Sequence, residues 1–153
     1  MRGLRLGGHP LHPALVHFPV ACWSAVPVTD ALFVGLHQPV WWQISWWLLV
    51  IGCASALAAM AAGMMDLLAI PATHPAGAVA QRHLLLMGSA WCVFLFDLLL
   101  RPRQGTVTAA VAWGGLALSV LGWIIVLIGA YAGAQLVYQY GIGRSDRHDA
   151  PPA

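Results

Sequence analysis

The sequence predicts an all-α integral membrane protein, a four-helix transmembrane up-down bundle. Sixty per cent of the 153 residues are apolar and only 8% are charged, whereas a soluble domain carries about 25% charged residues to cover its core. Four apolar stretches are each long enough to cross a bilayer core, which takes roughly 20 helical residues. The links between these stretches are short, so we expect consecutive helices to pack antiparallel.

The four spans are predicted, in order, at about 13–36, 41–70, 82–100 and 106–140. Pro13 falls in the first turn of the first span, where its missing N–H costs nothing. Arg2 and Arg5 precede this span as in a signal peptide, but prolines interrupt the apolar run and no cleavage site follows, so we expect the helix to be retained. One domain at 1–143 is followed by a polar segment, 144–153, which we expect to be a disordered tail.

The arginines predict the orientation. If the N-terminus is cytoplasmic, five arginines lie inside and two lie outside, which the positive-inside rule favours; the inner set is Arg2, Arg5, Arg82, Arg144 and Arg147, and the outer set is Arg101 and Arg103. Both termini are therefore expected in the cytoplasm. Four tryptophans form an aromatic belt at the outer end of the second span: Trp41, Trp42, Trp46 and Trp47.

Several function classes find no support. The formal charge of +2 and the lack of a basic strip with interleaved aromatics argue against a nucleic-acid partner. Cys22, Cys53 and Cys92 lie in apolar stretches and form no C-x-x-C pair, so neither a disulfide nor a zinc site is expected. No triad of nucleophile, base and orienting group is visible, so hydrolytic chemistry is not predicted.

Two patterns concern helix packing. Small residues recur at four-residue spacing in Ala59/Gly63 and Gly129/Gly133, which predicts close approach of helix backbones, unless it reflects only Ala- and Gly-rich helices. A faint repeat is also present, because Asp30 and Asp97 are separated by the same 67 residues as Trp46 and Trp113. The hypothesis that follows is a duplicated two-helix hairpin.

Because consecutive helices run in opposite directions, most polar side chains are expected at the cytoplasmic end: His9, His12, His17, Asp66, His74, Arg82, His83, Gln135, Tyr138 and Tyr140. At the other end, Asp97 and Arg101 are four residues apart and can form an ion pair. Asp30 can pair with Arg101 or Arg103. We expect Asp30 and Asp97 to be structural groups near helix ends, where water lowers the cost of a charge.

Asp66 lies one turn inside the membrane end of the second span, where an ionisable group normally has a partner. Either Arg82 or a histidine of that end would serve, as a capping pair or as a functional contact. His37 is expected to be an interfacial polar group and His148 a solvated tail residue.

His17 and His83 are placed near the cytoplasmic ends of helices that are diagonal partners in a simple bundle. Two facing imidazoles can supply both axial ligands of a b-type haem, with Arg82 meeting the propionates and Tyr138 completing the cofactor-binding set. Alternative ligands are His9, His12 and His74. Since His9 and His12 each precede a proline, both are predicted to be extended, as the rim of a cofactor site or as a rigid lid, and Pro19 frees the carbonyl of Leu15.

Two motifs are distinctive, namely Gly8-His9-Pro10-Leu11-His12-Pro13 and Val16-His17-Phe18-Pro19. With weaker matches at Asp30, 63–66, His83 and 133–141, they make the chain resemble the bacterial small membrane proteins catalogued as domain of unknown function 2231. Ala134 and Gln135 depart from the Gly-rich turn expected there. The resemblance implies four spans, a bacterial inner membrane and a redox setting, because relatives are sometimes joined to Rieske-type iron–sulphur modules. This chain lacks the ligands for a cluster of its own.

Three functions follow from different classes. The first is an electron-transfer membrane protein that binds haem, and the second is a cofactor-free accessory subunit packed on a larger respiratory complex. In both cases the partners are the lipid bilayer and other membrane subunits. The third, a transporter or metal-handling protein, is disfavoured because no charged residue near mid-membrane lines a path. The first two remain open.

Overall fold

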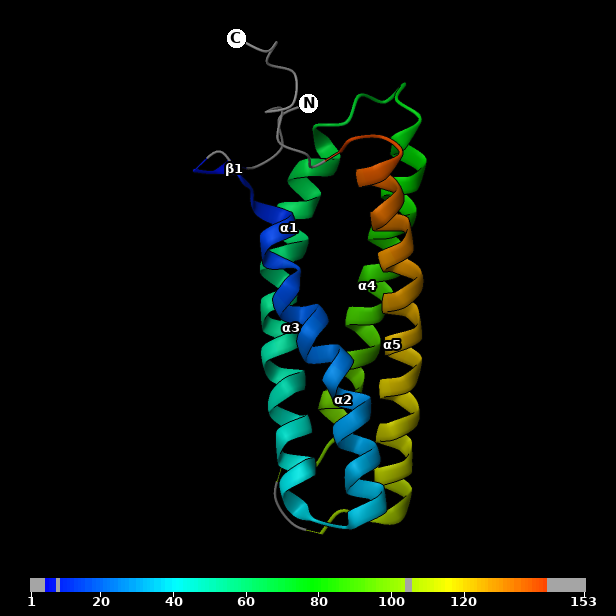
Figure 1. Ribbon diagram of the computed structural model, residues 1–153. Coiled ribbons are helices and arrows are strands. Elements are labelled where there is room, and N and C mark those ends of the chain that lie inside the picture. Colours follow the sequence, from blue (N-terminus) through cyan, green and yellow to red (C-terminus); the bar gives the residue numbers. More distant parts are fainter. Residues whose placement is uncertain (1–4, 8, 104–105, 143–153) are drawn as a thin grey trace.

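A computed structural model describes residues 5–7, 9–103 and 106–142. Four membrane-length helical spans run side by side, as the composition predicts (Figure 1). In chain order the helices are α1 (Leu11–Leu15), α2 (His17–Leu36), α3 (Pro39–Leu68), α4 (Ala76–Leu100) and α5 (Ala109–Tyr138). Each of the four spans, with α1 and α2 forming the first, is long and apolar enough to cross a membrane. The predicted all-α four-helix membrane bundle is confirmed.

The first span begins earlier than expected and carries His12 in a helix. Strand β1 (Arg5–Leu6) pairs antiparallel with β2 (His9–Pro10), so His9 is extended as predicted. The extended conformation predicted for His12 is wrong, because His12 lies in α1. Pro13 is the third residue of this helix, and N–H groups of a first turn have no partner within the helix. Only Val16 separates α1 from α2, where Pro19 has no N–H to donate to Leu15.

The links define the helix ends. α2 ends at Leu36, as predicted, and the next residue, His37, takes the left-handed conformation (φ 55) and donates its N–H to the Phe33 carbonyl at 2.9 Å. α4 begins at Ala76, six residues before the predicted start at 82, because the Nδ1 of His74 accepts the Ala76 N–H at 3.1 Å. The predictions for Arg2, Arg144, Arg147, His148 and the tail fall outside the described residues.

The bundle consists of two helical hairpins. α2 packs along α3, and α4 packs along α5, while α2–α5 and α3–α4 contacts join the two hairpins. α2 and α4 are therefore diagonal to each other, as expected for an up-down bundle. In Figure 1 both hairpins start and finish at the upper end of the view. We call this end, defined by His12 and His83, the histidine end, and the opposite end, defined by Arg101, the arginine end.

The two hairpins are copies of one pattern. Every buried residue of α5 lies 70 positions after a buried residue of α3; in α5 these are Ala112, Gly115, Ser119, Gly122, Val126, Gly129 and Ala132. In the same way, four buried residues of the first span recur 71 positions later: Pro19, Trp23, Val26 and Asp30 match Ala90, Phe94, Asp97 and Arg101. The predicted duplication is therefore present in the packing, but its predicted 67-residue offset is wrong by about one helical turn.

Matching residues of the two hairpins meet across the diagonal in three layers. His12 faces His83 at the histidine end, with ring centroids 6.3 Å apart. Trp23 stacks on Phe94 in the middle, with centroids 4.8 Å apart and planes at 12°. Asp30 pairs with Arg101 at the arginine end. Each layer joins residues 71 positions apart, so a local twofold axis runs along the bundle between α2 and α4.

Candidate functional site

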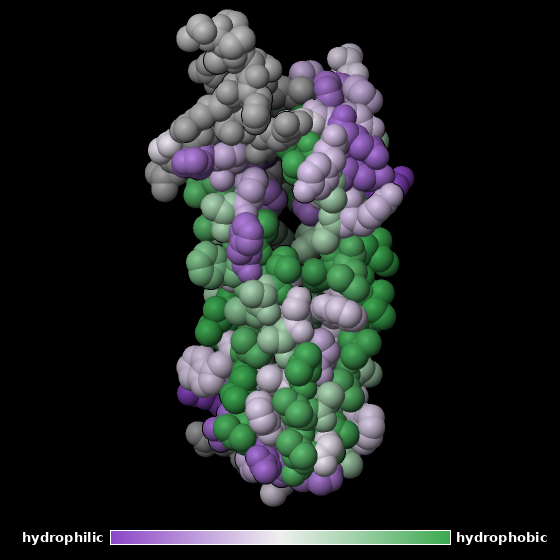
Figure 2. Space-filling model, viewed as in Figure 1, coloured by the Kyte–Doolittle hydropathy of each residue, from purple (hydrophilic) through white to green (hydrophobic). Residues whose placement is uncertain are grey.

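A largely apolar cavity of about 320 Å³ occupies the histidine end of the bundle. It extends from Trp23 and Val126 to Ile142, and both His12 and His83 line it. The space exists because small residues face it from the surrounding helices: Ala56, Ala59, Gly63, Ala80, Ala130 and Gly133. Figure 2 shows the surface hollowed at this level, between the N-terminal segment and α5.

The two histidines in the cavity share one hydrogen-bonding arrangement. The Nδ1 of His12 lies 2.8 Å from the carbonyl oxygen of Ala59 in α3, and the Nδ1 of His83 lies 2.8 Å from that of Gly129 in α5. A carbonyl oxygen only accepts hydrogen bonds, so both Nδ1 atoms carry the hydrogen. In the neutral ring the Nε2 atom is then an unprotonated acceptor. The site therefore holds two imidazoles of fixed tautomer, with ring planes at 81°.

A glycine one turn beyond each acceptor makes room for the imidazole. A methyl group added at Gly63 would lie 2.8 Å from Cε1 of His12, and one added at Gly133 would lie 3.1 Å from Cε1 of His83. The small-residue pairs Ala59/Gly63 and Gly129/Gly133 thus each hold one histidine ring. Their four-residue spacing was visible in the sequence, but the sequence analysis assigned it to close approach of helix backbones.

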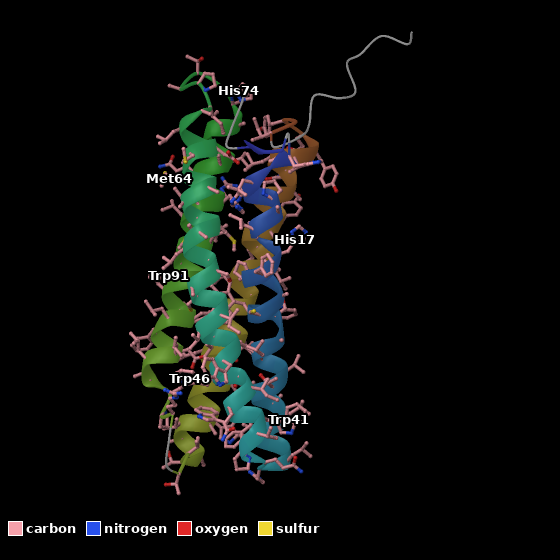
Figure 3. The ribbon with its side chains drawn as sticks, turned by 90° about the vertical axis from the view of Figure 1, so that its left-hand side faces the viewer. His17, Trp41, Trp46, Met64, His74 and Trp91 are labelled. Atoms are coloured by element: carbon pink, nitrogen blue, oxygen red, sulfur yellow. The ribbon has the colours of Figure 1, made fainter. Side chains whose placement is uncertain are left out.

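His17, which was predicted to face His83, does not lie in the cavity. Its side chain is exposed, with Nδ1 3.3 Å from the carbonyl oxygen of Ala14. Figure 3 shows its ring on the outside of the bundle, away from α3 and α4. Five residues of helix correspond to a rotation of about 140° between His12 and His17. Only one of these two rings can face the diagonal partner, and the structure brings His12 to His83.

The other predicted cofactor residues surround the cavity or lie away from it. Arg82 is exposed and the Tyr138 side chain is 84% exposed, and neither lines the cavity. His9 is also exposed. His74 caps α4, and its ring centroid lies 6.2 Å from that of Tyr140. Asp66 lines the cavity and is half-buried.

The arginine end carries a different polar group, centred on the Arg101 guanidinium. This guanidinium donates to Asp30 through Nη1 and Nη2, both at 2.6 Å. It donates to Asp97 through Nε at 2.9 Å and Nη2 at 2.6 Å. Its fifth N–H reaches the Ser45 hydroxyl at 2.8 Å, and that hydroxyl donates to Asp30 at 2.6 Å. All five donors of the guanidinium are therefore satisfied.

This network joins α2, α3 and α4, lies against Gly115 of α5 and is closed to water. Asp30 is 0% and Asp97 1% exposed, so the expectation that water lowers the cost of these charges is wrong. The Arg101 guanidinium pairs with both carboxylates instead and offsets one of their two negative charges. The Trp42 ring lies 4.5 Å from the guanidinium carbon, and Gly115 of α5 leaves room for the same group. Burial lowers the pKa of Arg101, but the hydrogen bonds and charges of Asp30 and Asp97 outweigh it and raise the pKa.

Within the described residues, no group of three or more His, Cys, Asp and Glu side chains is arranged to hold a metal ion. Cys22, Cys53 and Cys92 are all free thiols. Two polar groups stand out among the described residues: the two histidines in the cavity at one end and the Arg101 network at the other.

Comparison with curated proteins and with solved structures finds no match. The family model described as a predicted membrane protein, domain of unknown function 2231, matches residues 8–146. The matched region includes His12, His83 and the whole Arg101 network. With four membrane-length spans and a family match over nearly its whole length, the chain belongs to this family of predicted membrane proteins.

Proposed function

We propose that this protein binds one b-type haem between His12 and His83 and passes electrons within the membrane. The observation that carries the proposal is the matched pair of imidazoles, each with Nδ1 tied to a helix carbonyl. Histidines that ligate a metal typically donate their other ring N–H to a carbonyl or carboxylate. That hydrogen bond fixes the tautomer and leaves Nε2 as the ligand atom.

The distance between the rings suits a shared metal centre. Bonds of about 2 Å from one ion to a nitrogen of each ring would place the ring centres about 6 Å apart, and the His12 and His83 centroids lie 6.3 Å apart. The two rings come from diagonal spans of the bundle. His12 and His83 would together hold such a centre through their Nε2 atoms.

A haem fits these residues better than a bare ion. A structural zinc takes four protein ligands and a catalytic zinc takes three, but the described residues offer no such group. A haem needs only two axial ligands, because its porphyrin supplies the others. The apolar lining and the small residues of α3 and α5 suit a flat hydrophobic ring, and Arg82, at the start of α4, would meet propionates at the water boundary.

The chain's own residues would tune such a haem in two ways. The carbonyls of Ala59 and Gly129 would raise the basicity of the two ligands. The apolar walls, closed at mid-bundle by Trp23, would exclude water and keep the dielectric low. When bound, the haem would supply reversible one-electron transfer.

We further propose that the histidine end faces the cytoplasm of a bacterial cell, with the protein in the inner membrane. The five-to-two distribution of arginines supports this orientation. A cysteine introduced at Gln38, in a variant without Cys22, Cys53 and Cys92, should react with a membrane-impermeant reagent from the periplasm only. Labelling from the cytoplasm alone would reverse the assignment.

The haem proposal is tested by the visible spectrum of detergent-purified protein from haem-replete cells. We expect the reduced protein to show the sharp bands of a six-coordinate low-spin haem. His12→Ala and His83→Ala should each lose these bands, because one imidazole cannot replace the missing ligand. His17→Ala is the matched control, five residues from His12 in the same span, and should keep the spectrum of the wild type.

Circular dichroism and gel filtration establish that each variant is folded. A colourless wild-type preparation that stays colourless when haem is added contradicts the proposal and favours the cofactor-free accessory subunit. Bands that survive His12→Ala but are lost in His17→Ala would instead restore the ligand pair His17 and His83.

A further inference from the structure

A second cavity lies at the arginine end, far from the two histidines in the first cavity. It has a volume of about 280 Å³ and is lined by Trp42, Gln43, Trp46, Trp47, Pro102 and Arg103. The guanidinium carbon of Arg103 lies 5.0 Å from the Trp46 ring centroid and 5.8 Å from that of Trp47. The two indole rings pack edge to face with centroids 4.9 Å apart. Arg103 is thereby held over an aromatic platform.

The charge of Arg103 is not neutralised by the part of the chain that the structure describes. No carboxylate and no hydrogen-bond acceptor within those residues contacts its guanidinium, which makes only the two contacts with tryptophan rings. Arg101, two residues before it, has all five donors satisfied by Asp30, Asp97 and Ser45. Stacking on tryptophan orients the planar guanidinium but leaves its N–H donors free for an anion.

The position of this cavity specifies the kind of anion. Trp46 and Trp47 lie about two turns into α3, near the end of a membrane-spanning helix, and tryptophan is enriched at the membrane–water boundary. Exposed apolar side chains follow one side of α3, past the level of the cavity and on towards the middle of the bundle, at the spacing of successive helical turns: Val40, Ile44, Trp47 and Ile51. An anion at Arg103 that also carries acyl chains would lay them along this stripe.

We propose that Arg103, Gln43 and the Trp46–Trp47 pair bind the phosphodiester of one phospholipid in the leaflet at the arginine end. A guanidinium presents two parallel N–H donors that match two phosphate oxygens, and the amide of Gln43 supplies a further donor from α3. Basic pockets between transmembrane helices bind anionic headgroups in this way. The site is independent of the haem proposal, because no residue is shared between the two cavities.

Native mass spectrometry of the full-length protein, titrated with phosphatidylglycerol, tests the inference. The wild type should retain one lipid, and Arg103→Gln should need about tenfold more lipid for the same occupancy, the effect expected for loss of one charge-assisted pair of hydrogen bonds. Arg103→Lys keeps the charge but loses the two parallel N–H donors of the guanidinium, so its lipid occupancy should lie between those of the wild type and Arg103→Gln. Arg82→Gln, the matched control, removes an exposed arginine at the histidine end and should bind as the wild type does.

Two further arms separate the possible sources of the phosphate and of the affinity. Inorganic phosphate alone should not raise the thermal unfolding temperature in detergent, whereas phosphatidylglycerol should raise that of the wild type and not that of Arg103→Gln. Equal stabilisation by inorganic phosphate would overturn the lipid assignment. Equal binding of diacylglycerol, which lacks the phosphate, or unchanged lipid binding by Arg103→Gln would overturn the site itself.

Discussion

The two ends of the bundle are built on the same duplicated hairpin but differ in how their polar groups are satisfied. At the arginine end, three buried charged groups and one hydroxyl satisfy one another, and Trp42 and Gly115 close over them. At the histidine end, two imidazoles are anchored on one side only, and a cavity of about 320 Å³ lies beside them. A closed network stabilises a fold, whereas an anchored but open pair of ligand atoms is what a binding site requires. We infer that the Arg101 network stabilises the fold, and the haem proposal rests on the histidine end.

The largest effect is expected from Arg101→Gln, which tests whether the network stabilises the fold. It leaves the buried carboxylates of Asp30 and Asp97 without their cation, and breaking a buried pair in this way costs about 3–5 kcal/mol. We expect a large loss of folded yield and of thermal stability in detergent. Arg103→Gln, two residues away and exposed, is the matched control and should change the free energy of unfolding by less than about 0.5 kcal/mol without added lipid. Equal losses of folded yield and thermal stability in the two variants would show that the network does not stabilise the fold.

Ser45→Ala tests the same network more finely. It removes the acceptor of one Arg101 N–H and the donor of one hydrogen bond to Asp30, and a buried donor left unsatisfied costs about 1–3 kcal/mol. Unfolding followed by circular dichroism should show this loss while the visible spectrum of bound haem stays the same. A haem spectrum altered by Ser45→Ala would show that the two ends are coupled.

The sequence predicted the number and direction of the spans better than it predicted which side chains meet at each end. Span number and antiparallel threading follow from apolar length and short links, and those features do not depend on single side chains. Which histidine faces the axis depends on the rotation of one helix. The proline after His12 favoured an extended conformation, but Pro13 lies in the first turn of α1 and is tolerated there. Because the helix was predicted to start after His12, His17 was chosen in its place as the residue that faces His83.

The repeat shows the same limit. Pairing aspartate with aspartate gave an offset of 67 residues, yet the structure matches Asp30 with Arg101, its ionic partner. Two copies of a hairpin that meet at an axis place matching positions in contact, and like charges at such a contact repel. Opposite charges are therefore expected at matched positions on the axis, and identity of charged residues is a poor guide to register.

Glycine substitutions at the histidine end should have smaller effects on stability. Gly63→Ala places a methyl group 2.8 Å from Cε1 of His12, so the ring must shift and its hydrogen bond to Ala59 is weakened, at a cost of about 1 kcal/mol. We expect lower haem occupancy with little loss of fold. Gly88→Ala, where an added methyl meets nothing within 4 Å, should leave occupancy unchanged. Full occupancy in Gly63→Ala would mean that the glycine does not hold the ring in place.

The smallest expected effect is that of alkaline pH on the arginine end. Asp30 and Asp97 raise the pKa of Arg101 above its ordinary value. A raised pKa means that the stability contributed by the charged guanidinium is fully present below the unfolded pKa and is lost only as pH rises through the higher folded value. Between pH 7 and pH 10 the difference in unfolding temperature between wild type and Arg101→Gln should therefore not shrink. A difference that shrinks over this range would show that the buried cation loses its proton and that the network is not closed to water.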